Sequence, residues 1–347
     1  MASSSALPSA ILVHEYVTGG GWPEPELPAQ LGCEAAALVR ALLADLRAWG
    51  RFPVVVTHDP RWPTESLAVD RVVDLRAEVY PRELLRLARE CGAAIVVAPE
   101  GGGVLERLSS LMLDAGVCLL GSLPQAVAVA ADKSECHRRF AEAGLPTPDT
   151  LCVAPAAAAA AAARLGYPVV VKPLDGAGCA GVCLARDESR LEAALRLPAL
   201  QGRAAVLVQR YVEGRAASVS LLATTAGTTV LSLNAQSVRP GIPFVYHGGV
   251  AGVSHPRGAE ACRLAQRAVA LVPGLRGYVG VDLVLGEEAC WLMEINPRPT
   301  TSYVGLRRVI DLNMAAAIWS ACREGALPSA VRLAAPSSHG DGWPDGN

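Results

Sequence analysis

The chain has 347 residues, of which 51% are hydrophobic and 18% charged, and its formal net charge is −2. This length allows two or three domains of roughly 100 to 200 residues, each with a sizeable core. Lysine and arginine are scattered without a basic block, which argues against nucleic acid as a partner. No run of about 18 strongly apolar residues predicts a membrane span. The ten cysteines stand singly, so we expect reduced thiols rather than disulfides or zinc ligands.

The two ends of the chain have the composition of tails. Residues 1–9 lack the basic start and apolar core of a secretion signal, so we expect a flexible tail on a cytoplasmic protein. Residues 331–347 are rich in Ser, Gly, Pro and Asp and are expected to be disordered. Nothing in the sequence fixes the oligomeric state, and a homodimer is compatible with it.

Strands and helices alternate in the first third of the chain. Apolar runs bounded by Pro or Gly predict strands at 10–13, 53–57 and 93–98, and helical patterns predict helices at 32–50 and 81–91. Such alternation predicts an α/β fold with a parallel sheet, helices on both faces, and a ligand at the carboxyl ends of the strands. We therefore assign residues 10–125 to a Rossmann-like domain.

Glycine-rich segments follow two of these strands, where a ligand is expected. The first contains Glu15, Thr18, Gly19 and Gly20, and the second runs from Glu100 to Gly103. The first begins well after its strand and is not G-x-G-x-x-G, so support for a nicotinamide site is weak. Either its glycines serve a turn that needs positive φ, or their N–H groups line a substrate pocket. On the second interpretation all four residues are substrate-binding candidates.

A strand is expected at Val169–Lys172 and ends in a lysine. A glycine-rich loop from Asp175 to Gly181, which includes Gly176 and Gly178, follows it, and a further strand is expected at 182–184. Strand, glycine loop and strand are typical of a flap that closes over phosphates, with lysine supplying charge. A second lysine, Lys133, opens a helix expected through residue 140. These are the only lysines, against 29 arginines, which favours sites that need a compact ammonium group over chance surface positions.

A hairpin is expected near the C-terminus, from a strand at 278–285 and a second strand that carries Glu294, Asn296 and Arg298 on one face. If Leu285 pairs with Ala289 across a three-residue loop, Asp282 lies opposite Leu292 on that same face. A two-residue loop would set it opposite Met293, facing away. Asp282, Glu294 and Asn296 together predict a site for Mg²⁺ or Mn²⁺. The alternative is a surface hairpin with solvated acids.

Taken in order, several segments resemble the ATP-grasp superfamily over roughly residues 125 to 320: Asp132-Lys133, Tyr167 to Pro173, the glycine loop, Val208 to Gly214, Asp282, and Glu294 to Arg298. The resemblance implies a pre-ATP-grasp domain at residues 10–125 and a two-lobed ATP-grasp domain at residues 126–330.

The resemblance also implies ATP as the nucleotide and a role for each matching residue. Lys133, Lys172, Gly176 and Gly178 would contact its phosphates, and the segment Gln209, Arg210, Tyr211, Val212 and Glu213 would border the adenosine. Asp282, Glu294 and Asn296 would hold the metal, and Arg298 would face the transferred phosphate or the acyl intermediate, which makes Arg298 and Lys172 the catalytic candidates. Many family members have glutamate at the positions of Arg210 and Ala216, so the ribose contact stays open, with Glu213 or Ser218 as substitutes.

Within the superfamily, the segments Glu15 to Gly21 and Glu294 to Leu306 resemble the tyramine–glutamate ligases of methanofuran biosynthesis and their bacterial relatives in one-carbon metabolism. This implies ATP-driven amide formation between a glutamate side chain and an aromatic amine, with small-molecule amino acid and amine substrates. Thr301 and Tyr303 either line the substrate pocket or pack the end of a helix. The alternatives are an ATP-grasp ligase for another amino acid pair, carboxyphosphate chemistry, or a non-catalytic ATP-binding module.

Overall fold

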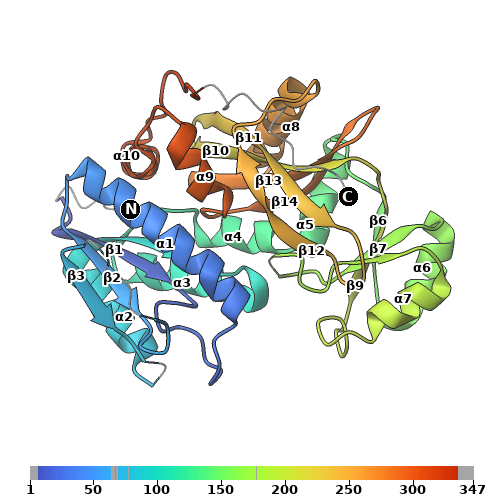
Figure 1. Cartoon of the computed structure of the whole chain (residues 1–347), viewed down its shortest axis with the longest axis horizontal. Helices are drawn as coiled ribbons and strands as arrows, with labels where there is room; N and C mark the ends of the chain where they lie inside the picture. Colours follow the sequence, from blue (N-terminus) through green and yellow to red (C-terminus); the bar gives the residue numbers. More distant parts are fainter. Residues whose placement is uncertain (1–6, 64–66, 68, 77, 177, 335–347) are drawn as a thin grey trace.

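The computed structural model describes residues 7–63, 67, 69–76, 78–176 and 178–334. Residues 1–6 and 335–347 of the expected tails, and Ala177 of the expected flap, lie outside the described residues. The chain forms one parallel sheet followed by two antiparallel sheets, and Figure 1 shows the parallel sheet at one end of the molecule and the small antiparallel sheet at the other. This confirms the predicted fold class.

The N-terminal sheet is parallel, in the order β3-β2-β1-β4-β5. Its strands are β1 (Ala10–Glu15), β2 (Val54–His58), β3 (Arg71–Asp74), β4 (Gly92–Val97) and β5 (Cys118–Leu119). Strands β1 and β2 are buried along their whole length and β4 almost so, which agrees with a sheet covered on both faces. Helix α1 (Ala29–Trp49) packs on one face, and α2 (Tyr80–Cys91) and α3 (Val104–Asp114) pack on the other.

Two strands of this sheet were missed by the sequence analysis. Strand β3 is mostly exposed at the sheet edge and β5 has only two residues, so neither shows an apolar run. The strands β1 and β4 are neighbours at the point where the strand order reverses. Ligands of doubly wound sheets bind at such a reversal, and both glycine-rich segments follow these strands.

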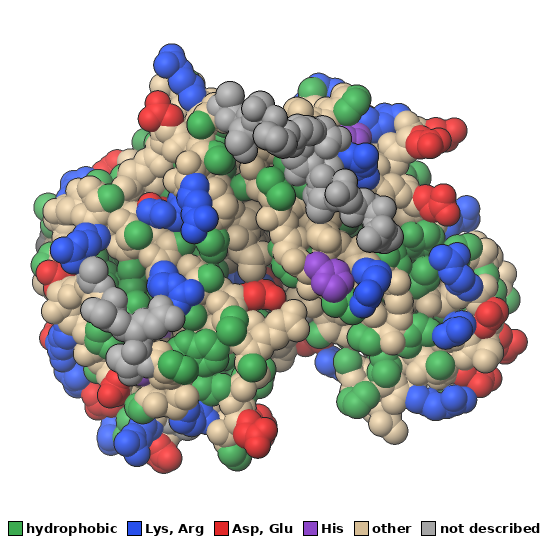
Figure 2. Space-filling view, viewed as in Figure 1, with side chains coloured by type: hydrophobic (Ala, Val, Ile, Leu, Met, Phe, Trp, Pro, Cys, Tyr) green, Lys and Arg blue, Asp and Glu red, His purple; other side chains and the backbone are tan. Residues whose placement is uncertain are grey.

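The small sheet is antiparallel, in the order β6-β9-β7-β8, and helices α6 (Ala158–Leu165) and α7 (Glu188–Leu195) share its core. Its strands are β6 (Thr150–Val153), β7 (Val169–Lys172), β8 (Cys183–Ala185) and β9 (Val206–Arg210). Figure 2 shows the molecule hollowed between the parallel-sheet end and the end that carries α6 and α7, with acidic and basic side chains interspersed on this face.

The large antiparallel sheet has the order β12-β11-β10-β13-β14. Its strands are β10 (Arg215–Thr224), β11 (Gly227–Arg239), β12 (Val245–Ala251), β13 (Gly277–Leu285) and β14 (Cys290–Asn296). Helices α4 (Pro124–Ala131), α5 (Lys133–Glu142) and α8 (Gly258–Ala270) share a core with one face. Helices α9 (Ser302–Val309) and α10 (Met314–Trp319) cover the other face and pack against α1 of the first domain.

Residues 331–334 are held against the body of the protein, so the expected disorder from residue 331 is wrong for this stretch. Leu333 forms a β-bridge with Ile310, and Asp311 N–H donates to the carbonyl of Arg332 at 2.9 Å. Among the described residues, no helix combines the length and apolarity needed to cross a bilayer.

Candidate active site

The hairpin of β13 and β14 places Asp282 directly opposite Glu294. The two-residue loop considered from the sequence is right at the turn, because the Gly286 N–H donates to the Ala289 carbonyl at 3.0 Å and Leu285 pairs with Cys290. That pairing alone would set Asp282 opposite Met293, but the register shifts between Asp282 and Leu283, so two residues of β14 oppose one of β13. A bulge of this kind explains why Met293 and Glu294, although adjacent, both line the same cleft.

Asp282 is fixed by two amide donors. Asn296 Nδ2 donates to its Oδ2 at 3.1 Å, and Gln236 Nε2 donates to its Oδ1 at 3.1 Å. Burial and the neighbouring carboxylate of Glu294 raise the pKa of Asp282 to about 8. Burial also works against ionisation of Glu294, but the charges of Lys133 and Lys172 outweigh it and lower the pKa of that carboxyl.

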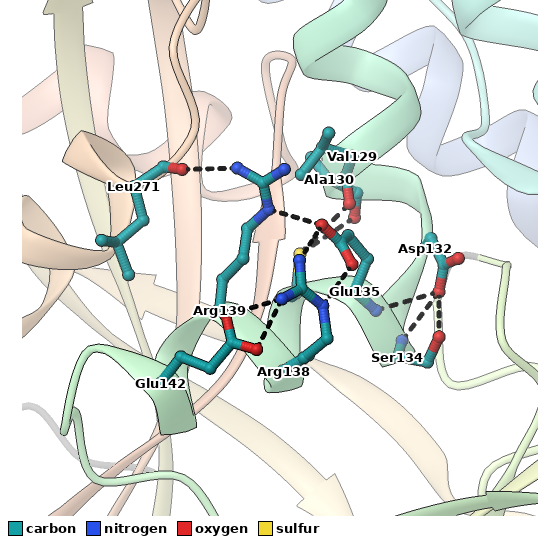
Figure 3. A network of polar contacts seen from close by, with 10 residues as sticks. Val129, Ala130, Asp132, Ser134, Glu135, Arg138, Arg139, Glu142 and Leu271 are labelled. Atoms are coloured by element: carbon teal, nitrogen blue, oxygen red, sulfur yellow. Dashed lines mark hydrogen bonds and ion pairs between the residues drawn. The ribbon is translucent and has the colours of Figure 1, made fainter.

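Lys133 is positioned by the start of α5, shown in Figure 3. Asp132 caps this helix by accepting from the N–H groups of Ser134 at 2.9 Å and Glu135 at 3.2 Å. Farther along, Arg139 Nη1 donates to the carbonyl of Leu271 at 2.9 Å and so ties α5 to the end of α8. The capped first turn directs Lys133 at the hairpin: its Nζ lies 3.1 Å from Glu294 Oε2 and donates to the Gly176 carbonyl at 2.9 Å.

Lys172, at the end of β7, lies in a buried polar cluster. Its Nζ donates to Gln209 Oε1 at 3.0 Å and lies 3.4 Å from His137 Nε2. Burial lowers the pKa of Lys172 to about 8, and burial together with Lys172 holds the pKa of His137 well below its usual value. A neutral histidine next to the lysine lets the ammonium group keep its charge for an anionic ligand.

These side chains open onto one cleft between the two antiparallel sheets, with about 860 Å³ not filled by protein atoms. The cleft brings together most of the residues expected to bind ATP and metal: Lys133, Lys172, Gly176, Gly178, Gln209, Arg210, Tyr211, Val212, Asp282 and Glu294. It also contains apolar residues that the sequence analysis missed: Val170, Val182, Phe244, Val284 and Met293. Of these, Val284 could have been found, because it stands two residues from Asp282 and therefore on the same strand face.

Of the two residues considered as ribose ligands, neither lines this cleft. Glu213 is exposed and lines a neighbouring shallow depression together with Val212. Ser218 belongs to β10 and is buried, with its hydroxyl 3.3 Å from that of Ser302. Neither residue is therefore placed to contact a ribose in this cleft.

Arg298 lies just after β14 and faces the N-terminal domain. Its Nη2 donates to Glu100 Oε2 at 3.0 Å, and its Nε lies 2.8 Å from Glu100 Oε1. Glu15 also acts on Arg298 electrostatically, while its Oε2 accepts from the N–H of Thr18 at 2.7 Å and the hydroxyl at 2.8 Å. The guanidinium is thus held where the glycine-rich segments of the first domain meet the hairpin.

Gly19 and Gly20 are buried in a tight turn. A Cβ at Gly19 would collide with the Glu15 carbonyl, and Gly20 has a φ of 92°. These contacts agree with the turn interpretation of the two glycines.

The two remaining substrate candidates differ in their surroundings. Thr301 lines a second cavity, with its Oγ1 3.1 Å from the hydroxyl of Tyr246. Tyr303 is fully buried and donates to Asp45 Oδ2 at 2.7 Å, which agrees with the packing interpretation.

The side chains present fit a divalent cation. Two carboxylates face each other in a half-buried site with amide groups beside them, an arrangement that a cation relieves. Among the residues that the structure describes, no three His, Cys, Asp or Glu side chains surround a common point. Mg²⁺ bound through one or two carboxylates, with phosphate oxygens and water completing its shell, needs no third acid.

Two buried lysines, a glycine-rich loop and paired carboxylates in one cleft are the groups by which a class of enzymes binds a nucleoside triphosphate together with a cation. A family model described as the ATP-grasp domain matches residues 130–302, and a model described as the pre-ATP-grasp domain matches residues 52–127. The chain belongs to the ATP-grasp family of ATP-dependent carboxylate–amine ligases.

Two relatives and a solved structure support the assignment to this family. A D-alanine–D-alanine ligase of Synechococcus is 32% identical over 61% of this chain and 68% of the relative. A tyramine–L-glutamate ligase of Methanocaldococcus fervens is 32% identical over 62% of this chain and 61% of the relative, so the chain spans less than two thirds of that protein. The crystal structure of an ATP-grasp superfamily protein from Archaeoglobus fulgidus shares the fold, with a TM-score of 0.69 over 93% of this chain and 90% of that one at 23% identity.

Proposed function

We propose that this protein joins a carboxylate, in the first instance the side chain of glutamate, to a primary amine of the tyramine type, with ATP converted to ADP and phosphate. The observation that carries the proposal is the convergence of Lys133, Lys172, Asp282 and Glu294 on one cleft. The identity to a tyramine–L-glutamate ligase supports the choice of substrates.

The first step activates the carboxylate. A carboxylate oxygen attacks the γ-phosphorus, the bond to the ADP oxygen breaks, and an acyl phosphate forms. Lys172 and Lys133 neutralise the phosphate oxygens in place, and the apolar residues of the cleft hold the adenine. Asp282, Glu294 and Asn296 would hold Mg²⁺ or Mn²⁺, which would supply further charge neutralisation on the transferred phosphoryl group.

In the second step, the neutral amine nitrogen attacks the acyl carbon, the carbon–oxygen bond to phosphate breaks, and inorganic phosphate leaves with the proton that the nitrogen gives up. The tetrahedral intermediate carries an oxyanion, for which Arg298 is the suitable partner because it stays cationic. Among the residues that the structure describes, its Nη1 donates only to the Pro299 carbonyl, at a long 3.3 Å, so a donor remains for a substrate oxygen.

Water would hydrolyse the acyl phosphate, so the flap has to stay closed during turnover. Asp175 at its start accepts from the Gly102 N–H at 2.8 Å, which docks the flap on the glycine-rich segment after β4. Lys133 Nζ donates to the carbonyl of the next residue, Gly176, and so holds the same end of the flap. The reaction belongs in the cytoplasm, where ATP is regenerated, and in the assembly of a methanofuran-like cofactor.

The test is ADP and phosphate release with L-glutamate and either tyramine or tyrosine, with the adduct identified by its mass. Release that depends on both substrates and yields the amide supports the proposal. Turnover only with another acceptor would assign the enzyme to a different amino acid pair. Tight ATP binding without any turnover would make the chain a nucleotide-binding module.

A further inference from the structure

A second cavity adjoins the nucleotide cleft and is not used by the mechanism above. It has about 1030 Å³ not filled by protein atoms and lies between α1, β12 and α9. Helix α1 contributes Gln30, Glu34 and Ala37, which follow one another at steps of four and three and so share one helix face. The other walls include Tyr246, His247 and Val250 of β12, and Thr301, Val304 and Arg308 at and along α9.

Tyr246 lines this cavity, and Phe244, two residues earlier in the chain, lines the nucleotide cleft. The hydroxyl of Tyr246 lies 3.1 Å from Thr301 Oγ1, three residues after Arg298. Burial raises the pKa of Tyr246, and the charges of Glu34 and Asp282 contribute to this. The second cavity therefore lies next to the nucleotide cleft.

Glu34 is a half-buried carboxylate in this cavity. Burial raises its pKa, with Gln30 as its hydrogen-bond neighbour and Arg298 as the cation that acts on it from a distance. Within the part of the chain that the structure describes, no Lys or Arg side chain lies at ion-pair distance from Glu34, including Arg308 of the same cavity. A carboxylate in a partly apolar cavity without such a partner is suited to pair with a cationic ligand.

We propose that this cavity is the acceptor site, and that it binds a primary ammonium group paired with Glu34 while the apolar body of the acceptor lies along Ala37, Val250 and Val304. The proposal rests on the proposed function, since an acceptor is needed only if an acyl phosphate forms. The negative charge of Glu34 disfavours the donor carboxylate in this cavity, and the positive charge of Arg298 favours that carboxylate close to the guanidinium. The cavity thereby separates the two substrates by charge.

Hydroxylamine provides a test that separates acyl-phosphate formation from acceptor binding. It is small and mostly uncharged at pH 7.5, and it converts an acyl phosphate to a hydroxamate without filling the cavity. The protein is incubated with ATP, Mg²⁺, L-glutamate and hydroxylamine, and tyramine is titrated in. Tyramine in the acceptor site lowers the hydroxamate yield, whether it reacts or only blocks access. The compound 4-ethylphenol, which has the same ring without the amine, serves as the uncharged comparison.

We expect Glu34→Gln to form hydroxamate at a rate within about twofold of the unaltered protein and to need at least tenfold more tyramine for half suppression. A tenfold shift corresponds to about 1.4 kcal/mol of binding free energy. Glu26→Gln removes the same charge from an exposed position outside the cavity and should change nothing. Glu34→Asp keeps the charge and should retain more of the tyramine effect than Glu34→Gln.

Equal tyramine sensitivity in Glu34→Gln and the unaltered protein would overturn the acceptor site, as would hydroxamate formation that tyramine never suppresses. Suppression by 4-ethylphenol as strong as by tyramine would also overturn it, because charge would then play no part. Loss of hydroxamate formation in Glu34→Gln would assign Glu34 to the first step instead. Absence of hydroxamate in the unaltered protein would overturn the proposed function itself.

Discussion

Arg298 and Glu100 join the end of the β13–β14 hairpin to the segment after β4, with Arg298 Nε 2.8 Å from Glu100 Oε1. Both side chains are largely buried, at 16% and 5% exposure. Burial works against the charge of Arg298, but Glu100, Glu15 and Glu294 outweigh it and raise its pKa. The guanidinium is therefore a fixed positive charge at the meeting point of the two domains.

Arg298→Lys should lower the rate of amide formation by about 10² to 10³, in the range found when one oxyanion donor is removed. Lysine keeps the charge but lacks the planar fork that can hold Glu100 and still present a donor to substrate. The measurement is kcat for amide formation, with ATP binding by calorimetry as the control. A variant with near-normal kcat would show that the oxyanion is stabilised elsewhere.

ATP binding should weaken as the pH rises above about 8. Burial lowers the pKa of Lys172 to about 8 in the free protein, and bound phosphates favour its protonated form. Above that pH, binding has to take up a proton, so the association constant falls by at most about tenfold per pH unit. Calorimetry between pH 7 and 9.5 in buffers of different ionisation enthalpy measures both the affinity and the proton uptake.

Lys172→Arg provides the control for this pH dependence, because arginine stays charged throughout the range. Its ATP affinity should be nearly constant between pH 8 and 9.5, even if weaker overall. Parallel pH profiles for the two proteins would assign the titration to another group of the cleft.

Tyr303→Phe should lower the free energy of unfolding by about 1.5 kcal/mol, because its hydroxyl donates to the charged Asp45. Arg307 remains paired with Asp45 at 2.8 Å, which limits the loss. The KM values for both substrates should stay unchanged, since Tyr303 is fully buried. A raised KM with unaltered denaturant stability would instead place the phenol in the substrate pocket.

Asp175→Ala should uncouple ATP hydrolysis from amide formation. The variant loses the hydrogen bond from Gly102 that docks the flap, so water reaches the acyl phosphate more often. We expect the ratio of ADP to amide product to rise above one. Arg203→Ala removes only the ion pair on the other oxygen of Asp175, at 2.6 Å, and should leave this ratio closer to one.

The sequence was sufficient for the fold class and for four of the charged residues that the cleft brings together, because Lys133, Lys172, Asp282 and Glu294 each belong to a short motif with its own strand or helix pattern. The register of the hairpin could not be predicted, since it depends on a bulge at Met293 rather than on loop length alone. Edge strand β3 and the two-residue β5 carry too little periodicity to be recognised.

Contacts between distant segments were equally beyond the sequence. Asp45 and Tyr303 are 258 positions apart, and Glu100 and Arg298 are 198 apart. Local patterns carry no information on such pairs, so Tyr303 could be placed either in the pocket or in the core. Glu34 could not be recognised from the sequence for the same reason. Its role depends on the cavity that α1 forms together with β12 and α9, which are distant in the sequence.

The central claim is that the paired carboxylates of the hairpin hold the cation on which phosphoryl transfer depends, and Glu294→Gln tests it most directly. The substitution is nearly isosteric and relieves repulsion with Asp282, so the circular dichroism spectrum and Tm should change little. Hydroxamate formation from ATP, L-glutamate and hydroxylamine should fall by at least about 100-fold. Hydroxamate formation at the rate of the unaltered protein would contradict the account.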